Sequence, residues 1–173
     1  MRVIPAGVGV LLLLSTGARA QTPVKSALAT TTKTPATHHT MASASKKGAD
    51  FVAVLEGGYE VPAVASAASG SAEFQVEGAD LHYVVHVTGL TDITAAHLHL
   101  GAAGKTGAPV VTLYSGPARG SGEIAEGTVR ASDVHGTTMS ALLAAMRKGD
   151  VYVNVHTTAH PEGAIRGQVR LQH

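Results

Sequence analysis

The most reactive pattern in this 173-residue sequence is a pair of histidines, His97 and His99, separated by one leucine. If this segment is a β-strand, the two imidazoles stand on one face, about 6.7 Å apart along the chain. Metal–nitrogen bonds of about 2.0–2.1 Å allow two such rings to converge on one ion. The spacing therefore predicts either a metal site or a pair of solvated or hydrogen-bonded imidazoles.

Two further histidines are candidates for the same site. His156 ends an alternating apolar run, and His160 follows across a turn, directly before Pro161. Neither motif contains a carboxylate, and the chain has no Cys. Imidazole ligands without thiolates suit copper or zinc, so we expect copper, with zinc as the alternative. The competing interpretation is that these histidines hydrogen-bond loop backbone and hold one end of the fold.

Other kinds of chemistry find less support. The absence of Cys excludes a disulfide scaffold, a Cys-ligated zinc site, an iron–sulfur cluster and a thiol nucleophile. No G-x-S-x-G motif of the hydrolase type is present. Glu56 and Glu60 could form an acid–base pair, but the two glycines after Glu56 indicate a turn. His38 and His39 are adjacent in a segment for which no helix or strand is predicted. With no rigid element to position them, we expect them to be solvated.

The elements that must position these histidines are short alternating runs divided by glycine-rich turns. Eight runs are typical of β-strands: Phe51–Glu56, Gly70–Val76, Leu81–Val87, Ala95–Leu100, Pro109–Tyr114, Gly122–Arg130, Val151–His156 and Ala164–Gln172. One segment has helical spacing, with Met139, Leu142, Leu143 and Met146 at i, i+3, i+4 and i+7 and Gly149 placed to cap it. We therefore predict an all-β fold: an antiparallel, Greek-key or immunoglobulin-like β-sandwich of about eight strands with one short helix.

Alternation along four of these runs separates a core face from an outer face. The residues predicted to face the core are Leu81, Tyr83, Val85 and Val87, then Ala96, Leu98 and Leu100, then Val151, Val153 and Val155, and finally Ile165, Gly167, Val169 and Leu171. The outer faces then carry His82, His86, His97, His99, Tyr152, Asn154, His156, Arg166, Gln168 and Arg170. Whether His82 or His86 joins the candidate site stays open at this point.

The first 49 residues differ from the rest. Residues 1–20 combine an early Arg2, a short apolar run and an Ala-Arg-Ala ending, which predict a signal peptide and a protein that is periplasmic or secreted. Residues 21–49 are rich in Ala, Thr, Ser and Lys and predict a disordered linker. Residues 50–173 form the predicted folded domain. No later run is apolar for long enough to span a bilayer, so we expect no transmembrane segment in the mature protein.

The charge balance of the predicted domain bears on its partners. Residues 50–173 carry seven Lys or Arg against twelve Asp or Glu, a balance of 7 − 12 = −5. A surface with that balance lacks the cations that displace counterions from a phosphate backbone. We therefore expect no nucleic-acid partner. A metal ion and an extracellular or envelope protein are the partners that remain.

Several blocks together resemble a known family. They are Glu60-Val61-Pro62, Leu81-His82-Tyr83, Gly89-Leu90, Ala96-His97-Leu98-His99, Gly101–Gly104, Gly107–Val111, Gly149–Thr157 and His160–Gln168. In this order they look like the CHRD domain, which occurs as repeats in chordin and singly in exported bacterial proteins. The resemblance covers residues 51–172. One departure is Ala164, where the family usually has Glu, so any acidic role at that position is absent here.

The CHRD pattern is in turn similar to the Cu/Zn superoxide dismutase sandwich. Carried over by position, His97, His99 and His156 match three copper ligands of that family, and Arg166 becomes a candidate anion guide. A long zinc loop and the paired cysteines of that family do not carry over. The resemblance therefore implies a copper-only site at most.

Three functions remain open from the sequence. The first is an exported copper-binding module, and the second is a copper-only oxidoreductase of the superoxide dismutase type. The third is a metal-free extracellular interaction or structural domain, as the resemblance to chordin implies.

Overall fold

Nine β-strands and one α-helix make up residues 48–173, the part of the chain that this computed structural model describes. The strands are β1 (Phe51–Glu56), β2 (Ser69–Glu77), β3 (Asp80–Thr88), β4 (Ile93–Leu100), β5 (Pro109–Arg119), β6 (Gly122–Val129), β7 (Val151–Thr157), β8 (Ile165–Gln168) and β9 (Arg170–Leu171). The helix is α1 (Met139–Lys148), and two 3₁₀ turns are η1 (Gly57–Tyr59) and η2 (Ala131–Asp133). The predicted signal peptide and nearly all of the predicted linker lie outside the described residues.

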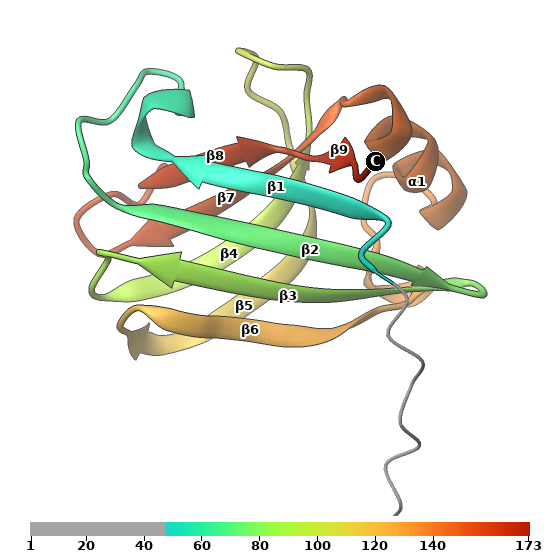
Figure 1. The fold of residues 1–173 in the computed structure, drawn as a ribbon, viewed down its shortest axis with the longest axis horizontal. Helices are drawn as coiled ribbons and strands as arrows, with labels where there is room; N and C mark the ends of the chain where they lie inside the picture. Colours follow the sequence, from blue (N-terminus) through green and yellow to red (C-terminus); the bar gives the residue numbers. More distant parts are fainter. Residues whose placement is uncertain (1–47) are drawn as a thin grey trace, which may run out of the picture. The chain divides into compact units, whose positions relative to one another are not determined.

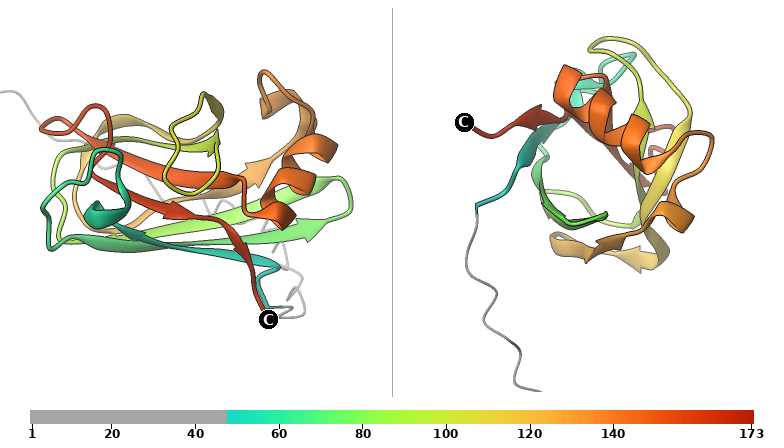
Figure 2. Two further views of the ribbon diagram at one scale, coloured as in Figure 1. Left: turned by 90° about the horizontal axis from the view of Figure 1, so that it is seen from above. Right: turned by 90° about the vertical axis from the view of Figure 1, so that its right-hand side faces the viewer.

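All of these strands belong to one antiparallel sheet that curls around a central core (Figures 1 and 2). The strand order is β5-β4-β7-β8-β1-β2-β3-β6, and β9 pairs with β1 beside β8. The helix α1 lies at one end of the strands and connects β6 to β7 (Figure 2). The predicted class, an antiparallel β-sandwich with one short helix, is confirmed in this barrel-like form.

The core confirms the faces that alternation predicted for β4 and β7. Ala96 and Leu98 of β4 are fully buried, and so are Val151, Val153 and Val155 of β7. The largest buried side chains of the other elements are Phe51, Leu55, Phe74, Leu81, Val85, Val87, Ile93, Ile124, Leu142, Met146 and Ile165. Each large side chain of this kind contributes about 1.5–3 kcal/mol of burial free energy. Packing of these side chains therefore holds the cysteine-free domain together.

The helix α1 closes the end of the core as its spacing predicted. The Thr138 hydroxyl accepts a hydrogen bond of 3.2 Å from the Ala141 N–H, which caps the first turn. Gly149 ends the helix with φ at 77°, a conformation that glycine adopts without strain. Its residues Leu142 and Met146 are fully buried in the core.

Two strands differ from the prediction by more than a shift of one or two residues at their ends. The predicted strand Pro109–Tyr114 continues as β5 through Ser115-Gly116-Pro117 to Arg119. The register between β4 and β5 shifts at several points, so the extra residues form bulges. Because β5 is at the end of the strand order, Pro117 does not remove a hydrogen bond between two central strands.

The last predicted strand divides into β8 and β9 at Val169. The Val169 N–H bonds to the Val151 carbonyl of β7, whereas Arg170 and Leu171 pair with β1. The prediction that Leu171 faces the core is wrong, because 42% of its surface is exposed. It pairs with Phe51 near the end of the chain, where the sheet extends past the closed core.

Candidate metal centre

Three predicted ligands come together because β4 and β7 are neighbours in the sheet. The antiparallel register pairs Ala95 with His156 and His97 with Asn154. Both strands turn their small and apolar residues into the core, so His97, His99 and His156 share the opposite face. A separation of almost sixty residues along the chain is thereby reduced to adjacent positions on one surface.

The three imidazoles are close enough to share an ion. One nitrogen from each of His97, His99 and His156 lies within 4.8 Å of the other two. The shortest approach, 3.1 Å, joins Nδ1 of His97 to Nε2 of His156. Three nitrogens that each lie about 2.0–2.1 Å from one ion are about 3.3–3.6 Å from one another. Side-chain shifts of about 1 Å therefore suffice to form a three-nitrogen site.

Backbone carbonyls decide which nitrogen of two of these rings carries the proton. Nδ1 of His99 lies 2.9 Å from the Gly107 carbonyl, and Nδ1 of His156 lies 2.9 Å from the Pro161 carbonyl. Since a carbonyl only accepts, both Nδ1 atoms carry the proton, and both Nε2 atoms present lone pairs. Such contacts orient metal-binding histidines in proteins. Nε2 of His99 is buried and has no hydrogen-bond partner, so it lacks only a ligand.

The surroundings keep the three rings neutral. Burial, followed by the nearby His156 and His99, lowers the pKa of His97 from 6.5 to about 4. Burial also lowers the pKa of His99 and of His156, although the carbonyls of Gly107 and Pro161 oppose this effect. Neutral imidazole is the form that binds a metal ion. At neutral pH the site is therefore in its ligating state.

Tyr152 packs against the candidate site. It is not among the site residues predicted from the sequence. Its ring stacks on His99 with centroids 4.8 Å apart and planes 13° from parallel. Its hydroxyl accepts from the Gly107 N–H at 3.1 Å and lies 3.3 Å from the Gly107 carbonyl. The same carbonyl accepts from His99, so Tyr152 and Gly107 together fix the His99 ring. The signal available in the sequence was its place on the outer face of the same strand as His156.

Arg166 lies behind Tyr152 rather than among the three histidines. Its guanidinium carbon is 3.4 Å from the centroid of the Tyr152 ring, and only 2% of the residue is exposed. Its Nη2 donates to the carbonyls of Lys105, at 2.6 Å, and Ala102, at 3.4 Å. The outer-face prediction for Arg166 is confirmed, but the loop 101–108 covers it. Tyr152 and Asn154 are buried on the same face.

The loop 101–108 approaches β4 closely enough to require glycine at one position. A Cβ at Gly107 would lie 1.5 Å from the Leu100 carbonyl oxygen. The absence of a side chain lets the Gly107 carbonyl reach His99. A local backbone constraint thus determines the protonated nitrogen of His99.

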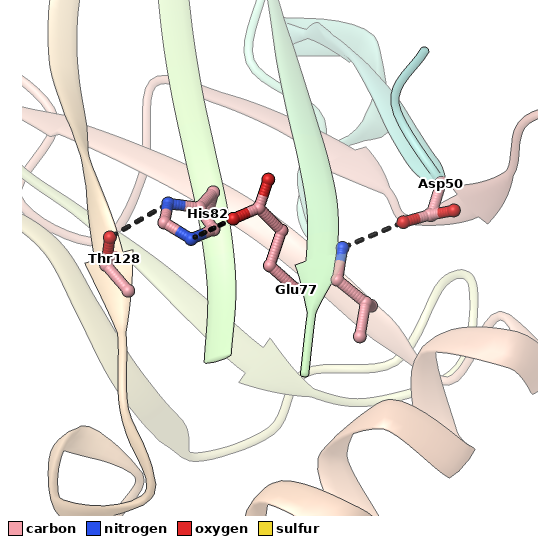
Figure 3. A network of polar contacts seen from close by, with 5 residues as sticks. Asp50, Glu77, His82 and Thr128 are labelled. Carbon is pink, nitrogen blue, oxygen red and sulfur yellow. Dashed lines mark hydrogen bonds and ion pairs between the residues drawn. The ribbon is translucent and has the colours of Figure 1, made fainter. Parts of the chain in front are cut away.

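The other histidine candidates lie elsewhere. His160 is exposed and is not part of the three-histidine group. Figure 3 shows His82 between Glu77, 3.3 Å from its Nε2, and Thr128, 2.9 Å from its Nδ1. His86 approaches Glu123 at 3.9 Å. Both belong to β3, which lies between β2 and β6 and away from β4 and β7 in the sheet.

Comparison with known proteins adds one result. The family model of the CHRD domain matches residues 51–169, a range that contains every strand except β9. No curated protein and no solved structure matches the chain.

Proposed function

The chain belongs to the CHRD domain family, and we propose that it is an exported protein that binds a copper ion through His97, His99 and His156. One observation carries this proposal: the Nε2 atom of His99 is buried without a partner, and its ring belongs to a group of three imidazoles whose nitrogens lie within 4.8 Å of one another. A buried polar atom without a hydrogen bond costs about 1–3 kcal/mol. A bound ion would remove that cost.

The ligand set favours copper over other first-row metals. The three donors are neutral imidazoles, without thiolate or carboxylate in the group. Divalent copper binds nitrogen sites more tightly than zinc in the general affinity order, and monovalent copper also accepts imidazoles. Zinc with three histidines and one water is the alternative. Competition between Cu(II) and Zn(II) distinguishes the two ions.

Export rests on the sequence of residues 1–20 and on the family. Among residues 48–173, no helix has the length and apolar character needed to cross a membrane. The proposal places the domain in the periplasm or outside the cell, where it stores, delivers or buffers the ion, and where an envelope or extracellular protein is its partner.

A second candidate is a copper-only oxidoreductase of the superoxide dismutase type. It is favoured by the partial exposure of His97 and His156, which leaves one side of the site open to a small molecule. Bound copper would supply one-electron chemistry, and the three histidines would hold it. In that case Arg166 could contribute only its positive field, because Tyr152 covers the guanidinium. Superoxide consumption by copper-loaded protein, compared with free copper, tests this candidate.

The test of metal binding combines metal analysis with thermal unfolding. The wild-type protein should bind one Cu(II) per chain, and copper at a hundredfold excess over Kd should stabilise it by about 2.7 kcal/mol. The variant His99→Ala should lose this stabilisation. His86→Ala, a histidine outside the group, is the matched control and should keep it. Equal copper-induced Tm shifts in wild type and His99→Ala would show that the ion binds elsewhere, and unchanged Tm in all three would favour the metal-free interaction domain.

A further inference from the structure

A cavity separate from the three histidines lies on the outer side of β1 and β8. Its volume is about 540 Å³, which is within the range of small-molecule sites. Residues of β1, η1, β8 and β9 line it, and Ala103 and Gly104 of the loop 101–108 complete the wall. None of the three histidines lines it, although Arg166, which stacks on Tyr152, belongs to its wall.

One wall of this cavity is apolar and open to solvent. Val54, Tyr59 and Val61 have 59%, 54% and 41% of their surface exposed. Leu171 is the remaining large hydrophobic residue of residues 48–173 with comparable exposure, and it does not line the cavity. Three of the four exposed large apolar side chains thus surround one hollow. A gathered apolar surface of this kind is typical of a binding site.

The cavity also carries positive charge. Arg166 is buried, and both hydrogen bonds that it donates to the protein come from Nη2. A guanidinium has five N–H donors, so Arg166, which lines the cavity, keeps donors beyond these two bonds. Arg170 is exposed at the rim. Two guanidinium groups in one cavity favour an anion, and Arg pairs well with a planar carboxylate.

Glu60 is the unusual group in the cavity. It lines the cavity and is nine-tenths buried, and its Oε1, which has no hydrogen-bond partner, is enclosed on the side of Gly163 and Asn154. Burial raises its pKa from 4.5 to about 7, although Arg166 and the Val61 amide oppose the shift. The protonated carboxyl can donate a hydrogen bond where the ionised form would repel an anion. The cavity therefore holds two cationic groups and one carboxyl that is readily protonated.

We propose that this cavity binds a small organic carboxylate with an apolar body. The carboxylate lies between Arg166, Arg170 and the protonated Glu60, and its body packs against Val54, Tyr59 and Val61. An amine would meet two guanidinium groups, and an ion without an apolar part would leave the exposed wall unused. This site is independent of the proposed copper ion.

The probes that test this proposal are 3-phenylpropionate, its uncharged amide and 3-phenylpropylamine. They are titrated into the purified protein with a chelator present, and binding is followed through backbone amide NMR shifts. The carboxylate should saturate at millimolar concentration or below and shift residues 52–61 and 166–170. The amide and the amine should bind at least about tenfold more weakly. Comparable binding of all three probes, tighter binding of the amine, or no saturable binding of the carboxylate would overturn the proposal.

Three variants separate the contributions of the charged and the apolar residues. Arg170→Gln changes an exposed side chain and should weaken binding of the carboxylate but not of the amide. Val54→Ser should weaken both. Leu171→Ser, the same kind of change at an exposed apolar residue outside the cavity, is the matched control and should alter neither. A loss of binding in Leu171→Ser equal to that in Val54→Ser would contradict the assignment of this cavity.

Discussion

At the scale of single residues, the candidate metal centre depends on groups that are not ligands. The carbonyls of Gly107 and Pro161 hold the Nδ1 protons of His99 and His156, and Tyr152 fixes the plane of His99. A ligand whose orientation is set in advance loses less entropy when the ion binds. Changes at these supporting residues should therefore affect the metal while the ligands themselves remain.

The Tyr152 hydroxyl provides a direct test of this support. Tyr152→Phe keeps the stacked ring but removes two contacts with Gly107, at 3.1 and 3.3 Å. We expect a loss of about 1 kcal/mol in the free energy of unfolding, because one net hydrogen bond disappears, and weaker Cu(II) binding. Chemical denaturation and copper titration measure the two effects. The control is Tyr83→Phe, whose hydroxyl donates to the Leu113 carbonyl away from the site. Equal copper affinity in all three proteins would show that Tyr152 is only structural.

Glu60 should leave a signature in the pH dependence of stability. Its folded-state pKa of about 7 exceeds the ordinary value of 4.5, so the folded state binds the proton more tightly than the unfolded state does. This contribution is fully present below pH 4.5 and is lost as the pH rises through 7. Glu60→Gln, which does not titrate, should therefore gain stability relative to wild type by about 3 kcal/mol between pH 4.5 and pH 8. Denaturant unfolding at several pH values measures the difference, and a difference that does not vary with pH would contradict the burial of this carboxyl.

At the scale of elements, the site is built by two neighbouring strands and one loop. β4 and β7 supply the three ligands, and the loop 101–108 covers the outer face between them and β8. The loop is held by hydrogen bonds from Arg166 and Gln168 to its carbonyls. Strand pairing therefore sets the distances between ligands, and the loop sets their burial.

Gly107→Ala tests the role of the loop. The added methyl group would meet the Leu100 carbonyl at 1.5 Å, so the loop must move away from β4. We expect a loss of about 1–3 kcal/mol of stability, as for overpacked sites, together with weaker copper binding. Gly120→Ala is the control, because nothing lies within 4 Å of its added Cβ. Thermal unfolding with and without copper compares the two variants, and equal behaviour would mean that the close approach has no role.

At the scale of the whole molecule, the chain joins a cysteine-free domain to an N-terminal region of different composition. Residues 50–173 have a formal charge balance of −5, whereas residues 21–49 carry four Lys and no Asp or Glu. A domain without disulfides depends on its packed core, and a bound ion would add to its stability.

Export is the prediction that belongs to this scale. If residues 1–20 are a signal peptide, the exported protein should begin at Gln21, because the Ala18-Arg19-Ala20 ending is the expected cleavage pattern. Intact-mass measurement of the protein from the periplasm or the medium determines its first residue. Replacing Ala20 by Phe should block cleavage, while replacing Ala27 by Phe, outside the pattern, should not. Exported protein that still begins with Met1 would contradict the prediction.

The local part of this protein was predictable from sequence alone. Alternation in β4 and β7 placed the histidines opposite the core, and helical spacing with Gly149 placed α1. These predictions succeed because side-chain direction along one strand or helix depends on the backbone period, a property of neighbouring residues. The pair His97 and His99 is of this kind, since two residues on one strand determine it.

Only the tertiary structure decided how that pair is completed. Which strand lies beside β4 depends on the packing of the whole sheet, and the pairing of Ala95 with His156 brings in the third imidazole while His160 stays exposed. The burial of Tyr152 and Arg166 depends on the loop 101–108. The alternation of residues along a strand does not indicate how closely a loop approaches it. The sequence by itself therefore determined the faces of the strands and the types of the candidate ligands. Long-range pairing and loop packing decided the three-histidine group and the cavity, because contacts between residues far apart in the chain leave no periodic signal in it.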